Sequence, residues 1–354
     1  MATPAIEADA VVIGAGPVGL FQVFQLGLLE VQAHVIDALP YAGGQCVELY
    51  PDKPIYDIPA VPVTTGRGLT ERLLQQIAPF GAHLHFSQQV ASVQRQDDGR
   101  IHLTTTTGQQ FCTKALFVAA GVGAFVARSL QLEGIAAFEH TQLHYRTPDL
   151  HTLAKRHVVI HGGGDAALEC ALEVLAPGNT HRPASVTLLH RRDVFTAAPD
   201  TQARVQALRA SGALRFAAAQ ITGFEAPGGN LKALQILDGE GESHALPTDQ
   251  LLVFLGISPK MGPIAEWGLA MERKQVQVNT EDFGTNVPGV FAVGDINHYP
   301  GKRKLIVCGF HEATLAAYGA MPFIFPEKNV MLQYTTTSPR LHALLGVQTP
   351  QKKS

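Results

Sequence analysis

The sequence predicts an α/β fold with two domains of the same kind, the second inserted into the first. Two observations predict it. An apolar strand at 9–14 leads into a turn with Gly14, Gly16 and Gly19, followed by an amphipathic helix over 17–30. The same order recurs from Val158, where an apolar strand leads into Gly162, Gly164 and Ala167 and a helix over 166–175. Both turns fit the GxGxx(G/A) fingerprint of Rossmann-like, dinucleotide-binding units with three ββα layers.

The other expected elements of the first domain follow from periodicity and turn residues. We expect helix 17–30 to face the sheet with Val18, Phe21, Leu26 and Leu29. The further elements are a strand at 34–37, a helix at 68–80, a hairpin of 90–94 and 101–106 around Asp97-Asp98-Gly99, and a buried strand at 116–120.

The second domain continues with a strand at 186–190, a hairpin over 220–237 turning at 227–230, and a strand at 251–255. The remainder carries no fingerprint but contains a short apolar strand that ends in Gly294-Asp295. We therefore expect residues 1–121 and 256–354 to form the first domain and residues 122–255 the second. The glycines at the crossovers, 121–123 and 256, serve either as hinges or as tight turns.

Composition narrows the function. The chain is 46% hydrophobic and 16% charged with a net charge of −3, which suits a globular protein and gives no global basic field for nucleic acid. No apolar run is long enough for a membrane span, and the N-terminus lacks a secretory signal, so a cytoplasmic location is expected. The four cysteines include no CxxC pair, so we expect buried thiols and no metal site.

The first fingerprint predicts FAD or NAD. Its glycines let the backbone approach a pyrophosphate, and a helix starting at Pro17 points free N–H groups at that charge. Asp37 ends the second strand, where a carboxylate bonds ribose hydroxyls and repels a 2′-phosphate. Asp295 favours FAD, because an acid after a buried strand can bond the ribityl chain; the alternative is a helix-capping Asp.

The second fingerprint predicts NADP. Arg191 and Arg192 stand where the first site has its acid, and guanidinium groups pair with phosphate. Asp165 belongs to the same glycine-rich turn. Glu169, early in the helix, either complements the helix dipole or orients the nicotinamide end, and the dipole role is preferred.

At these residues the chain resembles the thioredoxin-reductase-like flavoproteins over nearly its whole length. It departs from thioredoxin reductases because 142–147 reads QLHYRT, where they carry a CxxC. Within that superfamily it is similar to the ferredoxin–NADP reductases of the thioredoxin-reductase type. The matching stretches are 43–46 (GGQC), 49–57 (LYPDKPIYD), 123–125 (GAF), 144–145 (HY) and 334–337 (YTTT).

The resemblance implies roles for individual residues. Asp37 would hold the FAD ribose, and the flavin would be lined by Gln45, Tyr50, Val90, Phe125 and Asp295. Tyr50 and Tyr334 would stack on the flavin faces, and Thr335 or Thr336 would reach the flavin of the other subunit in a homodimer. Core packing is the alternative for both tyrosines.

The resulting prediction is a ferredoxin–NADP reductase that passes electrons from NADPH through FAD to ferredoxin or flavodoxin, without a catalytic acid or base. Lys302, Arg303 and Lys304 are expected to form part of a docking patch for the acidic carrier, with a solvated loop as the alternative. Two other functions stay open. One is a disulfide or peroxide reductase using Cys46, and the other is a non-catalytic FAD- and NADP-binding sensor.

Overall fold

The computed structural model describes residues 4–328 and 334–347, apart from the side chains of Phe125, Val126, Ile257 and Pro259. The chain forms two compact units, Met1–Phe125 with Pro259–Ser354, and Val126–Ser258. Each crossover lies in a short strand, β9 (Ala124–Ala127) or β17 (Ile257–Lys260), and these two strands pair. The crossovers thus fall a few residues beyond the expected boundaries.

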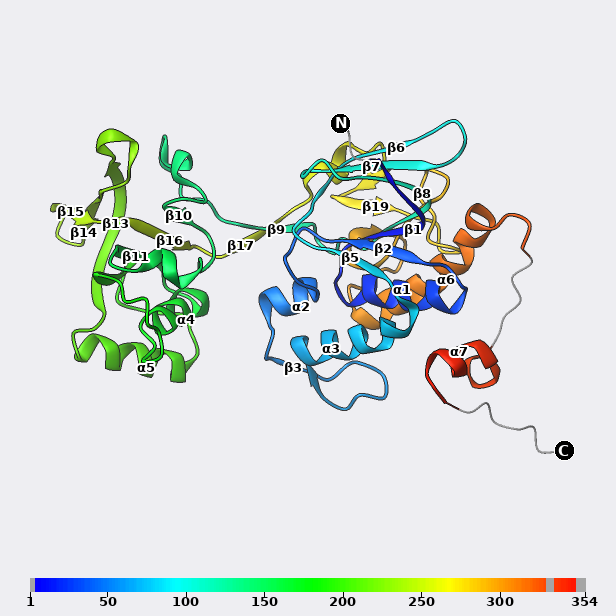
Figure 1. Cartoon of the computed structure of the whole chain (residues 1–354), viewed down its shortest axis with the longest axis horizontal. Helices are drawn as coiled ribbons and strands as arrows, with labels where there is room; N and C mark the ends of the chain where they lie inside the picture. The colour runs from blue at the N-terminus through cyan, green and yellow to red at the C-terminus, as the bar shows by residue number, and fades with distance from the viewer. Residues whose placement is uncertain (1–3, 329–333, 348–354) are drawn as a thin grey trace. The chain divides into compact units, whose positions relative to one another are not determined.

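The first unit is built on a seven-stranded sheet that includes the path β5-β2-β1-β8-β7-β6 (Figure 1). The seventh strand, β20, pairs with β8. Strands β5, β2, β1, β8 and β20 are parallel, and β6-β7-β8 is an antiparallel meander. The bounds are β1 (Ile6–Ile13), β2 (Ala33–Ile36), β5 (His83–His85), β6 (Val90–Arg95), β7 (Ile101–Thr105), β8 (Gln110–Val118) and β20 (Val290–Ala292). Short strands are β3 (Pro54–Ile55), β4 (Thr64–Thr65), β18 (Met271–Glu272), β19 (Gln275–Gln277) and β21 (Asn297–His298).

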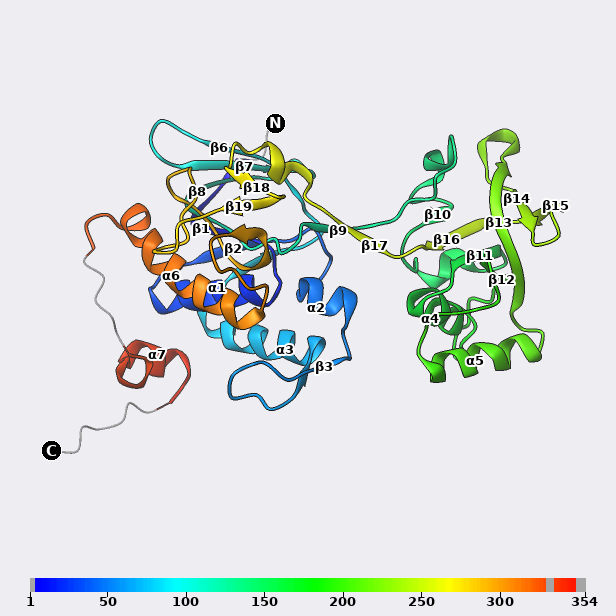
Figure 2. The same ribbon diagram turned by 180° about the vertical axis from the view of Figure 1, so that it is seen from behind.

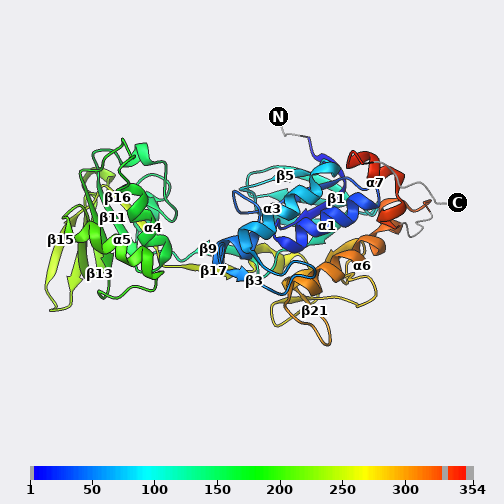
Figure 3. The ribbon, with the colours of Figure 1, turned by 90° about the horizontal axis from the view of Figure 1, so that it is seen from below.

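Both faces of this sheet are covered, which confirms the three-layer prediction. Ala10 and Val12 of β1 pack in a core with the helices, whereas Val11 and Ile13 point to the other face. Figure 3 shows α1 lying between α3 and α6 on the helical face. The helices are α1 (Pro17–Leu28), α2 (Gly44–Leu49), α3 (Gly66–Ile77), α6 (Ile306–Ile324) and α7 (Pro339–Leu344).

The expected face of α1 was only partly right. Leu26 is buried as expected, but the other side chains that fill the core are Leu20 and Val23. Val18 and Phe21 are partly buried, and the Phe21 ring lies 4.5 Å from the Phe310 ring of α6. The helix is apolar on nearly all sides because α3 and α6 flank it, so its sequence does not single out one face.

The second unit repeats the plan with the strand order β10-β16-β11-β12-β13-β14-β15. The first five strands are parallel, and β13-β14-β15 forms the expected antiparallel extension. Helices α4 (Asp165–Val174) and α5 (Pro199–Ala210) lie together against this sheet (Figure 2). The strands are β10 (Leu143–His144), β11 (His157–Gly162), β12 (Ser185–His190), β13 (Arg215–Glu225), β14 (Ala233–Asp238), β15 (Ser243–Pro247) and β16 (Gln250–Phe254).

Within the part of the chain that the structure describes, no helix has the length and apolar character needed to cross a bilayer.

Candidate functional site

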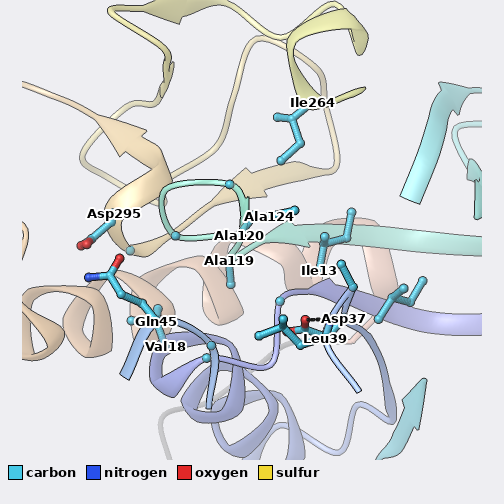
Figure 4. A pocket seen from close by; sticks show the side chains of 18 of the residues that line it. Ile13, Val18, Asp37, Leu39, Gln45, Ala119, Ala120, Ala124, Ile264 and Asp295 are labelled. Atoms are coloured by element: carbon cyan, nitrogen blue, oxygen red, sulfur yellow. Dashed lines mark hydrogen bonds between the residues drawn. The ribbon is translucent and has the colours of Figure 1, made fainter. Parts of the chain in front are cut away.

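The first unit contains an open pocket where β1, β2 and β8 end, with about 1050 Å³ of empty space including the solvent at its mouth. This is the usual ligand position in an open parallel sheet, at the carboxyl ends of the strands. Figure 4 shows Asp37 and Leu39 at one end of the pocket and Gln45 and Asp295 at the other.

The glycine-rich turn forms one wall of the pocket, and its glycines serve different purposes. Gly14 has a φ of +106°, and a Cβ there would lie 2.4 Å from the carbonyl oxygen of Ala119. Gly16 has ordinary extended angles, and a Cβ would meet nothing closer than the Gly44 Cα at 4.0 Å. The fold therefore requires glycine at 14, whereas glycine at 16 leaves open space at the N-terminus of α1, with Pro17 as the first helical residue.

Asp37 follows β2 and lines the pocket beside this turn. Its carboxylate accepts hydrogen bonds from the backbone N–H of Ala15 at 2.6 Å and of Leu39 at 2.8 Å. Burial raises the pKa of this carboxyl, and the two N–H donors oppose the rise. Asp37 thus ties the end of β2 to the fingerprint and presents a hydrogen-bond acceptor to the pocket.

Gln45, Tyr50 and Asp295 line the other end of the pocket, and Val90 lines its wall. The Tyr50 hydroxyl lies 3.3 Å from the Cys46 sulfur, and burial raises the pKa of Tyr50 well above its usual range. Burial also raises the pKa of Asp295, while the nearby ammonium groups of Lys302 and Lys304 lower it.

Lys302 is the clearest correction to the expected docking patch. Its side chain is only 6% exposed, and its ammonium donates to the carboxylate of Glu312 and to the carbonyl of Gly294 at 2.9 Å. Arg303 and Lys304 are exposed. Three successive basic residues therefore divide between one buried cation and two surface cations.

Several pocket residues were not anticipated from the sequence. Met261, Ile264 and Trp267 follow β17 and form a wall near Val90. The indole N–H of Trp267 donates to the carbonyl of Ala91 at 3.5 Å, a long contact. Trp267 is the one tryptophan of the chain, and this was the sequence feature that could have marked it as a candidate pocket residue. Glu312, which lies behind the pocket-lining Gly294, is the only acidic residue of the largely apolar helix α6, which also signals a buried partner.

Tyr334, Thr335 and Thr336 do not line this pocket in their own chain. Tyr334 is 68% exposed. Thr335 and Thr336, in a 3₁₀ turn, border a separate hollow beside Phe24 and Phe80. Phe125 lies in β9, but its side chain is outside the described residues.

The second fingerprint repeats the geometry of the first. A Cβ on Gly162 would lie 2.5 Å from the carbonyl oxygen of Phe254, and it would also approach Ala167. A Cβ on Gly164, the N-cap of α4, would approach only the Thr196 hydroxyl within 4 Å, at 3.8 Å. Asp165 accepts a hydrogen bond from the backbone N–H of Ala198 at 2.8 Å. As at Gly16 in the first unit, the second glycine of the motif, Gly164, leaves open space at the N-terminus of its helix, α4.

Arg191 and Arg192, just after β12, are exposed and make no ion pair with any carboxylate in the described part of the chain. The neighbouring acid is already neutralised, because Asp193 forms a bidentate pair with Arg209, both contacts at 2.8 Å. Burial, and then the charges of Arg191 and Arg192, lower the pKa of His190. The result is a concentration of positive charge at the end of β12.

The cysteines and the groups that could bind a metal suggest no further chemistry among the described residues. All four cysteines are free, and Cys46 is 2% exposed with a thiol pKa raised by burial. Within residues 4–328 and 334–347, no group of three or more His, Cys, Asp or Glu side chains is arranged to hold a metal ion.

Comparison with known proteins adds to this geometry. Residues 8–316 match the family described as pyridine nucleotide-disulphide oxidoreductase. The chain is 58% identical over 345 residues to "Ferredoxin--NADP reductase" of Methylibium petroleiphilum, covering 98% of this chain and 94% of that protein. It is 57% identical to the protein of the same name in Albidiferax ferrireducens, covering 98% and 97%. Its fold matches Lactococcus lactis thioredoxin reductase, with a TM-score of 0.56 at 20% identity over 90% of this chain and 99% of that one.

Proposed function

Because the chain belongs to the pyridine nucleotide-disulphide oxidoreductase family, we propose that it is a ferredoxin–NADP reductase working through bound FAD. The proposal rests on two glycine-rich, dinucleotide-binding turns whose neighbouring side chains, at the position expected to face the adenosine ribose, carry opposite charges. Asp37 occupies that position in the first unit, and Arg191 and Arg192 occupy it in the second. Curated relatives with that name match this chain over almost its whole length.

The pocket of the first unit fits FAD. The space left by Gly16 at the N-terminus of α1 would take the pyrophosphate, and the Asp37 carboxylate would accept from ribose hydroxyls. Gln45, Tyr50 and Asp295 would lie along the flavin end, with Tyr50 offering a ring to one flavin face.

The second unit fits NADP(H). The open N-terminus of α4 at Gly164 would take the pyrophosphate, and the 2′-phosphate would pair with Arg191 and Arg192. Neither guanidinium has a carboxylate partner among the described residues, so both are free to make bidentate contacts. Asp193 does not compete, since Arg209 holds it.

The protein's own residues supply binding, orientation and exclusion of water, and no acid or base is needed. Bound FAD supplies the change from the two-electron chemistry of NADPH to the one-electron chemistry of ferredoxin. Apolar walls, including Met261 and Ile264, would shield a bound flavin from water. We place the protein in the cytoplasm as a homodimer, with Tyr334 and Thr335 or Thr336 reaching the flavin of the second copy.

Ferredoxin is the proposed carrier, with flavodoxin as the alternative acidic partner. The surface cations Arg303 and Lys304, which follow the flavin-facing turn, are the proposed docking contacts. Arg303→Glu and Lys304→Glu variants should raise the apparent KM for ferredoxin while reduction of ferricyanide continues at the normal rate. An unchanged KM in both variants would remove these residues from the docking surface.

A thiol mechanism is disfavoured by the state of Cys46. Its sulfur is buried and its raised pKa keeps the thiol protonated, whereas a reactive cysteine needs a stabilised thiolate.

Three measurements test the function in order. The purified protein, supplied with FAD, should show flavin absorbance, and anaerobic NADPH should bleach it rapidly. Ferredoxin-coupled cytochrome c reduction should then be much faster with NADPH than with NADH. A protein that takes up no FAD, or a bound flavin that NADPH does not reduce, would refute the proposal, the second result favouring a sensor.

A further inference from the structure

A buried charge network holds the turn that carries Asp295. Glu312, on α6, is fully buried, and its carboxylate accepts hydrogen bonds from four donors. These are the backbone N–H of Gly294 at 2.7 Å, the side-chain amide of Asn297 at 2.8 Å, the hydroxyl of Tyr299 at 3.0 Å and the ammonium of Lys302. One side chain of α6 therefore fixes the segment that runs from β20 into β21.

Lys302 completes the hold on Gly294. Its ammonium donates to the Gly294 carbonyl at 2.9 Å, while Glu312 accepts from the Gly294 N–H at 2.7 Å. Both backbone groups of this glycine thus bond to the two members of one ion pair. Gly294 has a φ of +80° and lines the pocket directly before Asp295.

Stability alone does not account for such a pair. Two buried charges lose their hydration, and replacing a buried ion pair by well-packed apolar side chains is often neutral or stabilising. What apolar side chains cannot do is bond the N–H and C=O of one residue at the same time. The network therefore contributes geometry at Gly294, and with it the orientation of Asp295 in the pocket.

We propose that Glu312 and Lys302 are positioning residues that hold the Gly294–Asp295 turn ready for FAD and place the two opposite charges of a buried ion pair behind the flavin end of the pocket. The inference rests on the proposed function, because it assumes that FAD fills this pocket. It has a consequence that a purely structural pair would lack. Two-electron reduction adds negative charge to the flavin, so the Lys302 ammonium raises the flavin midpoint potential and the Glu312 carboxylate lowers it.

Three variants separate charge from structure: Lys302→Met, Glu312→Gln, and the double variant. Each single change strands a buried charge, so the FAD dissociation constant of the apoprotein should rise by at least about tenfold, and the double variant should recover part of that loss. The midpoint potential should fall in K302M, rise in E312Q and return towards the original value in the double variant. Lys302→Arg, which keeps the charge, should change the potential least.

A control outside the pocket is the ion pair between Lys114 and Asp9 in the same unit, 2.7 Å long and partly exposed. Lys114→Met should leave FAD affinity and flavin potential unchanged. Circular dichroism of each apoprotein shows whether the variant folds. If E312Q does not fold, the FAD affinities and midpoint potentials of K302M and K302R decide between a positioning role and a purely structural role.

The outcomes separate the two levels of inference. If the unmodified protein takes up no FAD, the proposed function fails. If it binds FAD but K302M keeps the original affinity and potential, the pair has no positioning role and the inference is overturned.

Discussion

The two kinds of glycine in the first fingerprint lead to a sharp prediction. Gly16→Ala should weaken FAD binding without harming the fold, whereas Gly14→Ala should damage the fold itself. At position 16 the backbone angles, φ −71° and ψ 176°, suit alanine, and the nearest atom to its Cβ would be 4.0 Å away. At position 14 the Cβ would lie 2.4 Å from the Ala119 carbonyl oxygen at a φ of +106°.

The magnitudes follow from these geometries. For Gly16→Ala, the loss of unfolded-state freedom stabilises by about 0.4–1 kcal/mol and the poorer helix cap costs a similar amount, so the apoprotein Tm should move by less than about 4 °C. For Gly14→Ala, left-handed strain of about 1–3 kcal/mol adds to the backbone overlap, and the Tm should fall by more than about 5 °C.

Although Gly16→Ala should barely change stability, it should weaken FAD binding strongly. A methyl group in the open space moves the pyrophosphate away from the N–H groups of α1, and each charge-assisted bond is worth about 1.5–3 kcal/mol. Losing one of these bonds should raise the FAD dissociation constant by about 10- to 150-fold, and losing two by up to about 20,000-fold. Fluorescence of the sole tryptophan, Trp267, reports the titration because its ring lines the same pocket.

The matched variant lies in the second unit. Gly164→Ala should raise the KM for NADPH and leave FAD affinity unchanged, because Gly164 is the corresponding open position at the N-terminus of α4. If Gly16→Ala binds FAD as tightly as the original protein, the pyrophosphate does not occupy that space and the reasoning fails.

Three further predictions concern charge and protonation. Arg191→Ala and Arg192→Ala should each raise the KM for NADPH by about 10- to 100-fold and leave the KM for NADH unchanged in steady-state assays, because each loses a charge-assisted contact to the 2′-phosphate. The folded-state pKa of His34 is lowered from 6.5 to about 4, mainly by burial. The folded state therefore favours the neutral His34 ring, and the stability that this contributes above pH 6.5 is lost as the pH falls towards 4. His34→Gln should flatten that part of a plot of Tm against pH. If the plots for the variant and the original protein run parallel, this prediction is wrong. Cys46→Ala should keep kcat within about twofold, because a buried, protonated thiol takes no part in turnover; loss of turnover on replacing it would restore the thiol mechanism.

The parts of this molecule that were predictable from sequence are those encoded over short distances. A strand, a glycine-rich turn and a helix lie within one stretch of chain, so the pattern at Gly14 and Gly162 fixed both the elements and their order. The second strand of a βαβ unit must end beside the first turn, which placed Asp37 at the pocket. The hairpins followed equally from alternation around turn residues.

Contacts that depend on packing between distant elements were not predictable in this way. The buried side of α1 is set by α3 and α6, so Leu20 and Val23 fill the core where periodicity favoured Phe21. The wall formed by Ile264 and Trp267 comes from a segment beyond the second unit, and no local motif marks it. A lone tryptophan and a lone glutamate in an apolar helix were the only local signals of what the fold brings to the pocket.

Lys302 shows why a charged run is a poor guide to a surface. In sequence, Lys302, Arg303 and Lys304 are equivalent cations, and a solvated or docking role fits all three. In the fold, Glu312 supplies a carboxylate inside the domain, and only the first of the three reaches it. The buried ammonium of Lys302 cannot contact an acidic partner protein without breaking its ion pair with Glu312. Charge changes at 302 should therefore alter the affinity for FAD, whereas charge changes at 303 and 304 should alter the KM for the carrier protein. If both proposals hold, the same basic run serves two separate functions, and the boundary between them is set by Glu312 on α6 rather than by the run itself.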